Sequence, residues 1–225
     1  MRIVVAGAHG KIARRLGALL VQRGDSVLGL IRNPDHAADL RADGVEPELA
    51  DLERLDVAAL AALLSDVDAA VFAAGAGPGS GAPRKDTVDR AASVLLADAC
   101  ERAGVRRFLQ ISAMGAARPN PPGVDPVFGA YLDAKRAAEQ DLQRRDLDWT
   151  ILRPGRLTDD PPTGRVVLGD SVERADVTRA DVAAVLVALL DEPASARRAL
   201  ELVNGDTPVA EAVRAAVHQP RTRSR

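Results

Sequence analysis

The stretch Gly7-Ala8-His9-Gly10-Lys11-Ile12-Ala13 decides the fold predicted for this chain of 225 residues. It follows an apolar run at residues 2–6 (RIVVA), which is typical of a buried β-strand. It leads into residues 11–23, where apolar side chains recur with the period of an amphipathic helix. The sequence therefore begins with a strand, a glycine-rich turn and a helix.

Each small residue of this turn has a physical role. Gly7 permits the tight turn, Gly10 permits the backbone to approach a ligand closely, and Ala13 lets the helix pack on the strand. The unpaired N–H groups and the dipole at the start of the helix attract phosphate. In this context the pattern predicts the pyrophosphate site of a nicotinamide dinucleotide. A turn with a purely structural role is the alternative.

The rest of the chain alternates short apolar runs with amphipathic segments. Further strands are predicted at 26–31, 45–49, 69–73, 106–112, 149–152, 165–168 and 199–203. Further helices are predicted at 55–64, 85–103, 130–145, 178–190 and 208–217, and four prolines predict a loop at 116–128. Such alternation with short connections predicts an α/β fold, a single doubly wound parallel-sheet domain of Rossmann type.

Length and composition predict one domain. We expect a dinucleotide-binding domain over residues 1–217 and a flexible basic tail over 218–225. The net charge of −2 does not favour binding to nucleic acid or to a membrane surface. The sequence has no signal peptide, no long apolar span and only one cysteine, so we expect a cytoplasmic protein. We expect Cys100 to be a buried thiol and the protein to be a monomer or a homodimer.

The residue after the second predicted strand indicates which dinucleotide is bound. An acidic side chain at this position would hold the ribose 2′-hydroxyl of NAD, but the chain has Arg32 there. A guanidinium suits a 2′-phosphate, so NADP(H) is favoured over NAD(H), and Lys11 can add charge near the phosphates. The alternative for Arg32 is a surface arginine without a ligand.

Other strand ends supply further candidate contacts to the cofactor. Asp51 follows the third strand and can accept a hydrogen bond from the adenine amino group, or it can cap the next helix. Ala73, Ala74 and Gly75 follow the fourth strand, and their small size leaves room for the dinucleotide. The three histidines are too scattered in the sequence to predict a metal site.

A second group of residues points to proton transfer. Tyr131 and Lys135 lie one helical turn apart, on one face of the predicted helix, and Ser112 ends the fifth strand. A phenol with a pKa near about 10 needs a nearby cation if it is to shuttle a proton at neutral pH, and Lys135 supplies one. Ser112 can polarise a substrate carbonyl. Alternatively, Tyr131 packs under the proline-rich loop while Lys135 points into solvent.

Together these segments resemble the atypical short-chain dehydrogenase/reductase family, in particular its small NmrA-like and biliverdin- and flavin-reductase-like members. The resemblance covers about residues 1–215. It rests on GAHGKIA at 7–13, the position of Arg32, DL at 51–52, FAAGAG at 72–77, AGVRRFLQISAMGA at 103–116, YLDAK at 131–135, DWTILRPGRLT at 148–158 and RADVT at 174–178.

The resemblance implies an NADP-binding oxidoreductase. It implies catalytic roles for Ser112, Tyr131 and Lys135, and it implies that Arg153, Pro154 and Gly155 close the nicotinamide end. The predicted cofactor-binding residues are Gly7, His9, Gly10, Lys11, Ile12, Arg32, Asp51, Leu52, Ala73, Ala74, Gly75, Pro154 and Gly155.

Three functions agree with these residues. The favoured one is hydride transfer from NADPH to a small-molecule carbonyl, quinone or flavin-like acceptor. The second is a non-catalytic regulator that senses NADP. The third is sugar-nucleotide epimerase or dehydratase chemistry, which is disfavoured because only about 70 residues follow the sixth strand.

Overall fold

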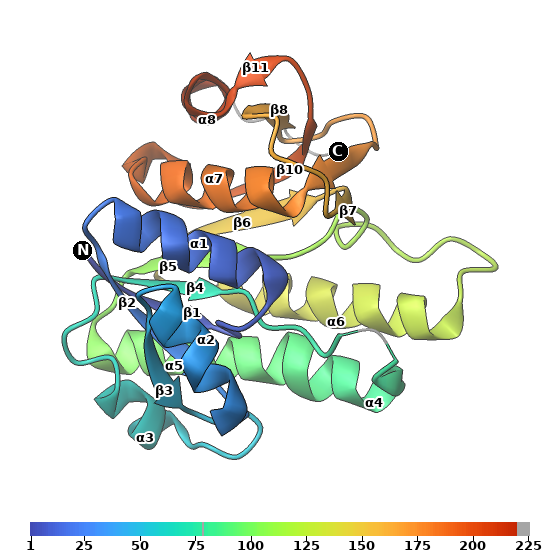
Figure 1. Ribbon diagram of the computed structural model, residues 1–225. Coiled ribbons are helices and arrows are strands. Elements are labelled where there is room, and N and C mark those ends of the chain that lie inside the picture. The colour runs from blue at the N-terminus through green and yellow to red at the C-terminus, as the bar shows by residue number, and fades with distance from the viewer. Residues whose placement is uncertain (78, 220–225) are drawn as a thin grey trace.

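The computed structural model describes residues 1–77 and 79–219, and its centre is a nine-stranded sheet (Figure 1). The strands are β1 Arg2–Ala6, β2 Ser26–Ile31, β3 Glu46–Leu49, β4 Ala69–Phe72, β5 Arg107–Ile111, β6 Asp148–Pro154, β8 Arg165–Gly169, β10 Arg198–Asn204 and β11 Thr207–Pro208. Their order in the sheet is β11-β8-β10-β6-β5-β4-β1-β2-β3. The strands β1 and β4 are neighbours although β2 and β3 lie between them in sequence, so the switch point of a doubly wound sheet lies between β1 and β4.

The sheet is mostly parallel. All strands from β3 across to β10 run parallel, whereas β8 pairs antiparallel with both β10 and β11. The prediction of a doubly wound, Rossmann-type parallel sheet is confirmed; the antiparallel strand β8 at this edge was not predicted. A separate two-stranded parallel sheet, β7 Arg156–Thr158 with β9 Asp176–Thr178, was not predicted.

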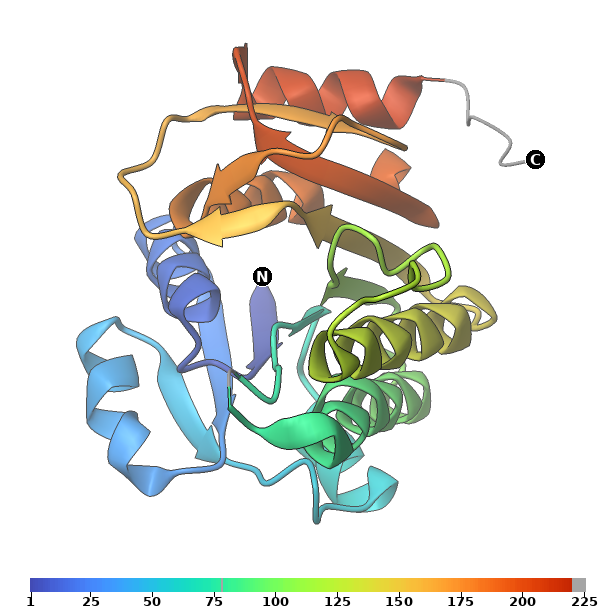
Figure 2. The same ribbon diagram turned by 90° about the vertical axis from the view of Figure 1, so that its right-hand side faces the viewer.

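Helices cover both faces of the sheet. They are α1 Lys11–Gln22, α2 Ala37–Ala42, α3 Val57–Ala62, α4 Gly81–Arg84, α5 Ala92–Ala103, α6 Pro126–Gln143, α7 Arg179–Leu190 and α8 Val209–His218, with the π-helix η2 Lys85–Ala91 and the 3-10 helices η1 Pro34–His36 and η3 Pro193–Ser195. The helices α1, α7 and α8 share one apolar core, and α3, α5 and α6 share the other (Figure 2).

The strand β1 shows how the sequence divides the two cores. Successive side chains of a strand point to opposite faces. Accordingly Ile3 and Val5 belong to the core beneath α1 and α7, while Val4 and Ala6 belong to the core beneath α3 and α5. A strand that is apolar at every position is therefore buried on both sides, as parallel sheets require.

Two helices begin four residues earlier than predicted. The segment 116–128 was predicted to be loop throughout, but α6 begins at Pro126, because proline is tolerated in the first helical turn and the Asp125 side chain accepts a hydrogen bond from the Phe128 N–H at 2.8 Å. The helix predicted at 85–103 begins at Gly81, and its first turns include the π-helix η2. The short helix α2 was not predicted.

The thiol of Cys100 is fully buried, as predicted. Among the described residues, no helix has both the length and the apolar composition needed to cross a bilayer.

In this same part of the chain, no three histidine, cysteine or acidic side chains gather in a way that could hold a metal ion. Of the predicted basic tail, His218 ends α8, and residues 220–225 lie outside the described residues.

Candidate functional site

The glycine-rich turn brings β1, β4 and the start of α1 together. Gly7 has a φ of +75°, and a Cβ placed on it would lie 2.6 Å from the Ala74 Cα. Any larger residue would therefore be strained and would also collide with the end of β4. The turn is closed by a hydrogen bond of 2.9 Å from the Gly10 N–H to the Gly7 carbonyl.

The start of α1 keeps its amides available. Gly10 is the N-cap residue, and no side chain caps the helix at this position. The first backbone bond to the N-cap carbonyl comes from the Arg14 N–H, at 2.9 Å. The preceding N–H groups of the first turn have no acceptor within the helix, which makes this end of α1 suited to an anion.

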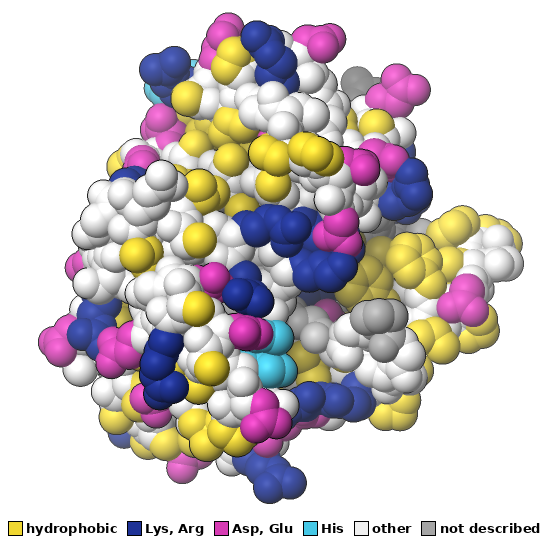
Figure 3. Space-filling view, in the orientation of Figure 1, with side chains coloured by type: hydrophobic (Ala, Val, Ile, Leu, Met, Phe, Trp, Pro, Cys, Tyr) yellow, Lys and Arg dark blue, Asp and Glu magenta, His cyan; other side chains and the backbone are white. Residues whose placement is uncertain are grey.

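A cavity of about 350 Å³ opens beside this turn, at the carboxyl ends of β1, β2, β3 and β4. Figure 3 shows this face, with histidine and basic side chains around a hollow in its middle. Nine of the thirteen predicted cofactor-binding residues line the cavity: Gly7, His9, Gly10, Arg32, Asp51, Leu52, Ala73, Ala74 and Gly75. Segments far apart in sequence thus meet at the strand ends, where open α/β sheets bind ligands.

The other four predicted residues are not among those that line the cavity. Ile12 packs against the core beneath α1. The Lys11 ammonium lies 2.6 Å from the Asp159 carboxylate, so in this structure its charge is already paired.

Pro154 and Gly155 have contacts of their own at the end of β6. The Pro154 carbonyl accepts a hydrogen bond from the Met114 N–H at 3.0 Å. A Cβ on Gly155 would lie 2.1 Å from the Ala175 carbonyl oxygen, so this position requires glycine for packing alone. A contact of Pro154 or Gly155 with a cofactor stays a prediction.

Two predicted residues have partners at the rim of the cavity. The His9 ring stacks on His36 with centroids 3.6 Å apart, and its Nε2 lies 2.7 Å from the Asp39 carboxylate. Asp51 accepts a hydrogen bond from the Glu53 N–H at 3.1 Å. The alternative role of Asp51 as a helix cap is wrong, because Asp56 is the residue that caps α3.

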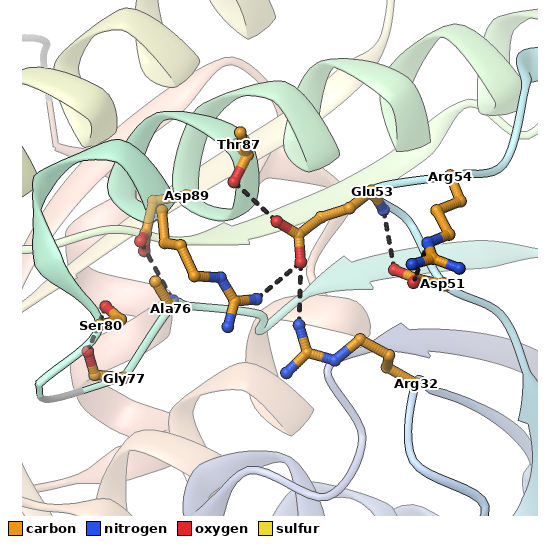
Figure 4. A network of polar contacts seen from close by, with 10 residues as sticks. Arg32, Asp51, Glu53, Arg54, Ala76, Gly77, Ser80, Thr87 and Asp89 are labelled. Carbon is orange, nitrogen blue, oxygen red and sulfur yellow. Dashed lines mark hydrogen bonds and ion pairs between the residues drawn. The ribbon is translucent and has the colours of Figure 1, made fainter.

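Arg32 belongs to a network that sequence reasoning did not find. Its Nη1 donates to Glu53 Oε2 at 2.8 Å, and Nη2 of Arg84 donates to the same oxygen at 2.6 Å. The other carboxylate oxygen, Oε1, accepts a hydrogen bond from the Thr87 hydroxyl at 2.7 Å (Figure 4). The pKa of Glu53 is lowered, mainly by the hydrogen bond from Thr87. The guanidinium groups of Arg84 and Arg32 also lower this pKa, whereas burial raises it.

Tyr131 and Lys135, two of the three residues predicted for proton transfer, lie one turn apart in α6. The Lys135 ammonium lies 5.8 Å from the centroid of the Tyr131 ring. Lys135 is only 4% exposed, and its Nζ donates to the Ile111 carbonyl at 3.2 Å, next to Ser112. The alternative that Lys135 points into solvent is therefore wrong. Burial raises the pKa of Tyr131, and the positive charge of Lys135 opposes this effect.

The side chain of Ser112 lies at the end of β5. It is buried, and its Oγ has no hydrogen-bond partner among the described residues. A buried hydroxyl without a partner is uncommon in folded proteins, because leaving it unpaired costs about 1–3 kcal/mol. Such a group is available to a ligand.

The π-helix η2 adds two charged residues to this end of the site. Asp89 Oδ1 lies 3.1 Å from the Lys135 Nζ. The Lys85 Nζ donates to the Gly77 carbonyl at 2.7 Å and lies 5.8 Å from the centroid of the Tyr131 ring. Sequence reasoning missed both residues. A signal for Lys85 existed, since it is one of only three lysines among 30 basic residues.

Comparison with known proteins identifies the family. A family model described as NAD(P)H-binding matches residues 7–193, which is most of the chain. The chain belongs to this NAD(P)H-binding family. The match spans the glycine-rich turn, the cavity and the Tyr131–Lys135 pair, and it confirms the resemblance to the atypical short-chain reductases.

Three proteins of known sequence or structure are similar to this NAD(P)H-binding chain along nearly their whole length. The uncharacterized sugar epimerase YhfK of Bacillus subtilis is 35% identical over 215 residues, which cover 95% of this chain and 99% of that protein. The solved structure of a putative NAD-dependent epimerase/dehydratase from Bacillus halodurans is 34% identical with a TM-score of 0.88, covering 96% of this chain and 99% of that one. ChuY, an anaerobillin reductase from Escherichia coli O157:H7, is 28% identical with a TM-score of 0.77, covering 92% and 98%.

Proposed function

We propose that this protein is an NADP(H)-dependent oxidoreductase that transfers hydride to a carbonyl, quinone or flavin-like acceptor. The observation that carries the proposal is the set of contacts that joins the cavity to Tyr131 and Lys135, which do not themselves line it. Ala76 lines the cavity and donates its N–H to Asp89 at 3.1 Å, and Asp89 pairs with Lys135. A phosphate-binding turn at Gly7 and Gly10 opens into the cavity, and the Tyr131–Lys135 pair lies on the helix that packs against η2.

The residues present suit a dinucleotide. The uncapped start of α1 offers backbone N–H groups to the pyrophosphate, and Gly7 allows β1 to pass within contact distance of Ala74. Ala73, Ala74 and Gly75 leave space beside them at the end of β4. Asp51 and Leu52 line the adenosine side of the cavity, and Arg32 supplies a cation for a 2′-phosphate.

The chain's own residues have separate roles in the reaction. When bound, NADPH supplies the hydride. Tyr131 donates a proton to the carbonyl oxygen of an acceptor, and its raised pKa keeps the phenol protonated at neutral pH. Lys135 holds a positive charge beside the ring, and the free Oγ of Ser112 orients the acceptor carbonyl.

The part of the chain after β6 favours a reductase over an epimerase. Within residues 155–219, β8, β10 and β11 extend the central sheet, and α7 and α8 complete one of its cores. This segment therefore supports the dinucleotide-binding fold itself and does not build a separate nucleotide-sugar domain. YhfK and the Bacillus halodurans protein are described as epimerases, so the choice rests on the segment after β6; the description of ChuY as a reductase agrees with it.

The test measures NADPH oxidation with a panel of aldehydes, quinones and flavins, together with NADPH binding by calorimetry. We expect turnover with at least one acceptor. In Tyr131→Phe we expect aldehyde reduction to fall by at least about a hundredfold, as loss of a general acid does, while NADPH binding persists. Quinone and flavin reduction should be affected less, because these acceptors do not require the phenol.

Two outcomes would contradict the proposal. Tight NADPH binding without turnover of any acceptor would indicate a sensor of the cofactor. An absence of binding to any of the four nicotinamide dinucleotides would remove both the enzyme and the sensor.

A further inference from the structure

Glu53 lies between two cations beside Asp51 and Leu52, in the part of the cavity that the proposed function assigns to the adenosine. Arg32 comes from the end of β2 and Arg84 from the end of α4, 52 residues away in sequence, and both donate to the same oxygen of Glu53. All three residues line the cavity. The network in Figure 4 therefore joins three separate segments of chain around one carboxylate.

The charges of this network do not cancel. Two guanidinium groups share one carboxylate, which leaves one positive charge in excess. The nearby carboxylate of Asp51 does not remove it, because it accepts from the Glu53 N–H and lies 3.5 Å from the Arg54 Nε on the outer side. A second anion with several oxygens would satisfy the N–H groups that the Glu53 carboxylate leaves unused.

We propose that Arg32 and Arg84 form a two-arginine clamp for the 2′-phosphate of the cofactor, and that Glu53 is a competing anion which occupies this clamp in the absence of ligand. The clamp rests on the proposed function. A 2′-phosphate carries about −1.5 to −2 charges near pH 7 and three acceptor oxygens, so it matches two guanidinium groups better than a single carboxylate does.

Glu53 is suited to being displaced. Its side chain is 27% exposed, and the Thr87 hydroxyl holds its other oxygen from the side of η2. The Glu53 carboxylate can therefore move away from the two arginines and still keep its hydrogen bond from Thr87. Because Glu53 competes with a phosphate but not with a ribose hydroxyl, its charge reduces the preference for NADP over NAD.

The test uses adenosine 2′,5′-bisphosphate and ADP as probes in titration calorimetry. These two ligands are isomers with two phosphate groups each, and only the bisphosphate has one of them on the 2′-oxygen. Both lack nicotinamide, so the measurement is independent of turnover. In Glu53→Gln we expect adenosine 2′,5′-bisphosphate to bind roughly threefold to tenfold more tightly and ADP to change by less than about twofold. In Arg84→Gln we expect the bisphosphate to bind about tenfold more weakly and ADP again to change little.

Arg54→Gln is the matched control. Arg54 lies next to Glu53 in sequence, but its side chain is 86% exposed and faces Asp51. We expect neither probe to change by more than about twofold in this variant, as for an exposed ion pair. Thermal unfolding of each variant confirms that it is folded at the temperature of the titration.

The clamp is overturned if Glu53→Gln weakens the bisphosphate, or if Arg84→Gln weakens both probes equally while ADP still binds the unmodified protein. In those cases the proposed function stands. If the unmodified protein binds neither probe nor any nicotinamide dinucleotide, the proposed function fails and the clamp fails with it.

Discussion

Lys135 and Asp89 form an ion pair in which Nζ lies 3.1 Å from Oδ1, and both residues are at least 96% buried. The second oxygen of Asp89 accepts a hydrogen bond from the Ala76 N–H at 3.1 Å. The pair thus connects the loop after β4, which lines the cavity, to the lysine beside Tyr131. Any change in this pair should reach both ends of the site.

Removing one charge of this pair should destabilise the protein strongly. Asp89→Asn leaves a buried ammonium without its counter-ion, and Lys135→Met leaves a buried carboxylate, so each should lower the free energy of unfolding by about 3–5 kcal/mol. The double variant buries no unpaired charge and should lose less than the sum of the two. Urea unfolding of the four proteins measures this coupling. Strictly additive losses would show that the two charges do not depend on each other.

The close approach of Gly7 to Ala74 leads to a second prediction. Gly7→Ala puts a Cβ 2.6 Å from the Ala74 Cα, so it should separate β1 from β4 and abolish detectable NADPH binding. Gly24→Ala is the matched control, because Gly24 also has a positive φ (+92°) but no heavy atom within 4 Å of the added Cβ. Both should lose about 1 kcal/mol or more of stability from the backbone. NADPH binding that survives in Gly7→Ala would contradict the position assigned to the cofactor.

The position of Arg32 leads to a third prediction. Arg32→Ala should weaken NADPH binding about tenfold and change NADH binding little, because the proposed partner of the guanidinium is the 2′-phosphate, which NADH lacks. Binding constants for the two dinucleotides, measured under one salt concentration, check this. Equal losses would refute the assignment of Arg32 to the 2′-phosphate.

The sequence predicted the parts of the fold that depend on local patterns. The strands β1 and β2 have the predicted bounds because each is an unbroken apolar run beside a glycine-rich connection. The helix α2 was missed because Leu40 is its only buried residue, so no period is visible. The direction of β8 was missed because residues 166–168 are apolar without a break, like those of a parallel strand, although the structure leaves Val167 exposed between the buried Val166 and Leu168.

The same distinction applies to the site. The turn at Gly7 and Gly10 was predictable because strand, turn and helix follow one another directly. The contacts of Glu53 with Arg84 and of Asp89 with Lys135 were not, because each joins segments more than 30 residues apart whose positions depend on how η2 packs against α6. The scarcity of lysine, read without regard to motif, was the one signal that pointed to Lys85.

The pH dependence of aldehyde reduction gives a fourth prediction. Burial raises the pKa of Tyr131 above its ordinary value, with a smaller opposing effect of Lys135. The proton donor therefore stays protonated beyond a pH of about 10, and kcat with an aldehyde should be level from neutral pH to at least about pH 9. Stopped-flow measurement of kcat at saturating NADPH over a range of pH tests this prediction. A basic limb with an apparent pKa below about 9 would mean that another group donates the proton.

The burial of the Cys100 thiol leads to a fifth prediction, which concerns the free energy of unfolding at alkaline pH. Burial, and to a smaller extent Glu101, raises the pKa of the thiol from 9.0 to about 12, so the folded protein keeps this proton at a pH where the unfolded chain has lost it. Since the unfolded state then binds fewer protons, the free energy of unfolding falls as pH rises from about 9 to about 12, by up to about 1.4 kcal/mol per pH unit. Below pH 9 the thiol is protonated in both states and has no such effect.

Cys100→Ala isolates this contribution from Tyr131 and the other groups that titrate in the same range. The variant should be less stable near neutral pH, because it leaves a small void under α5, but its stability should decline less steeply above pH 9. The two curves of unfolding free energy against pH should therefore converge between about pH 9 and pH 12. Parallel curves over this range would show that the thiol ionises as easily in the folded protein as in the unfolded chain, which its complete burial does not allow.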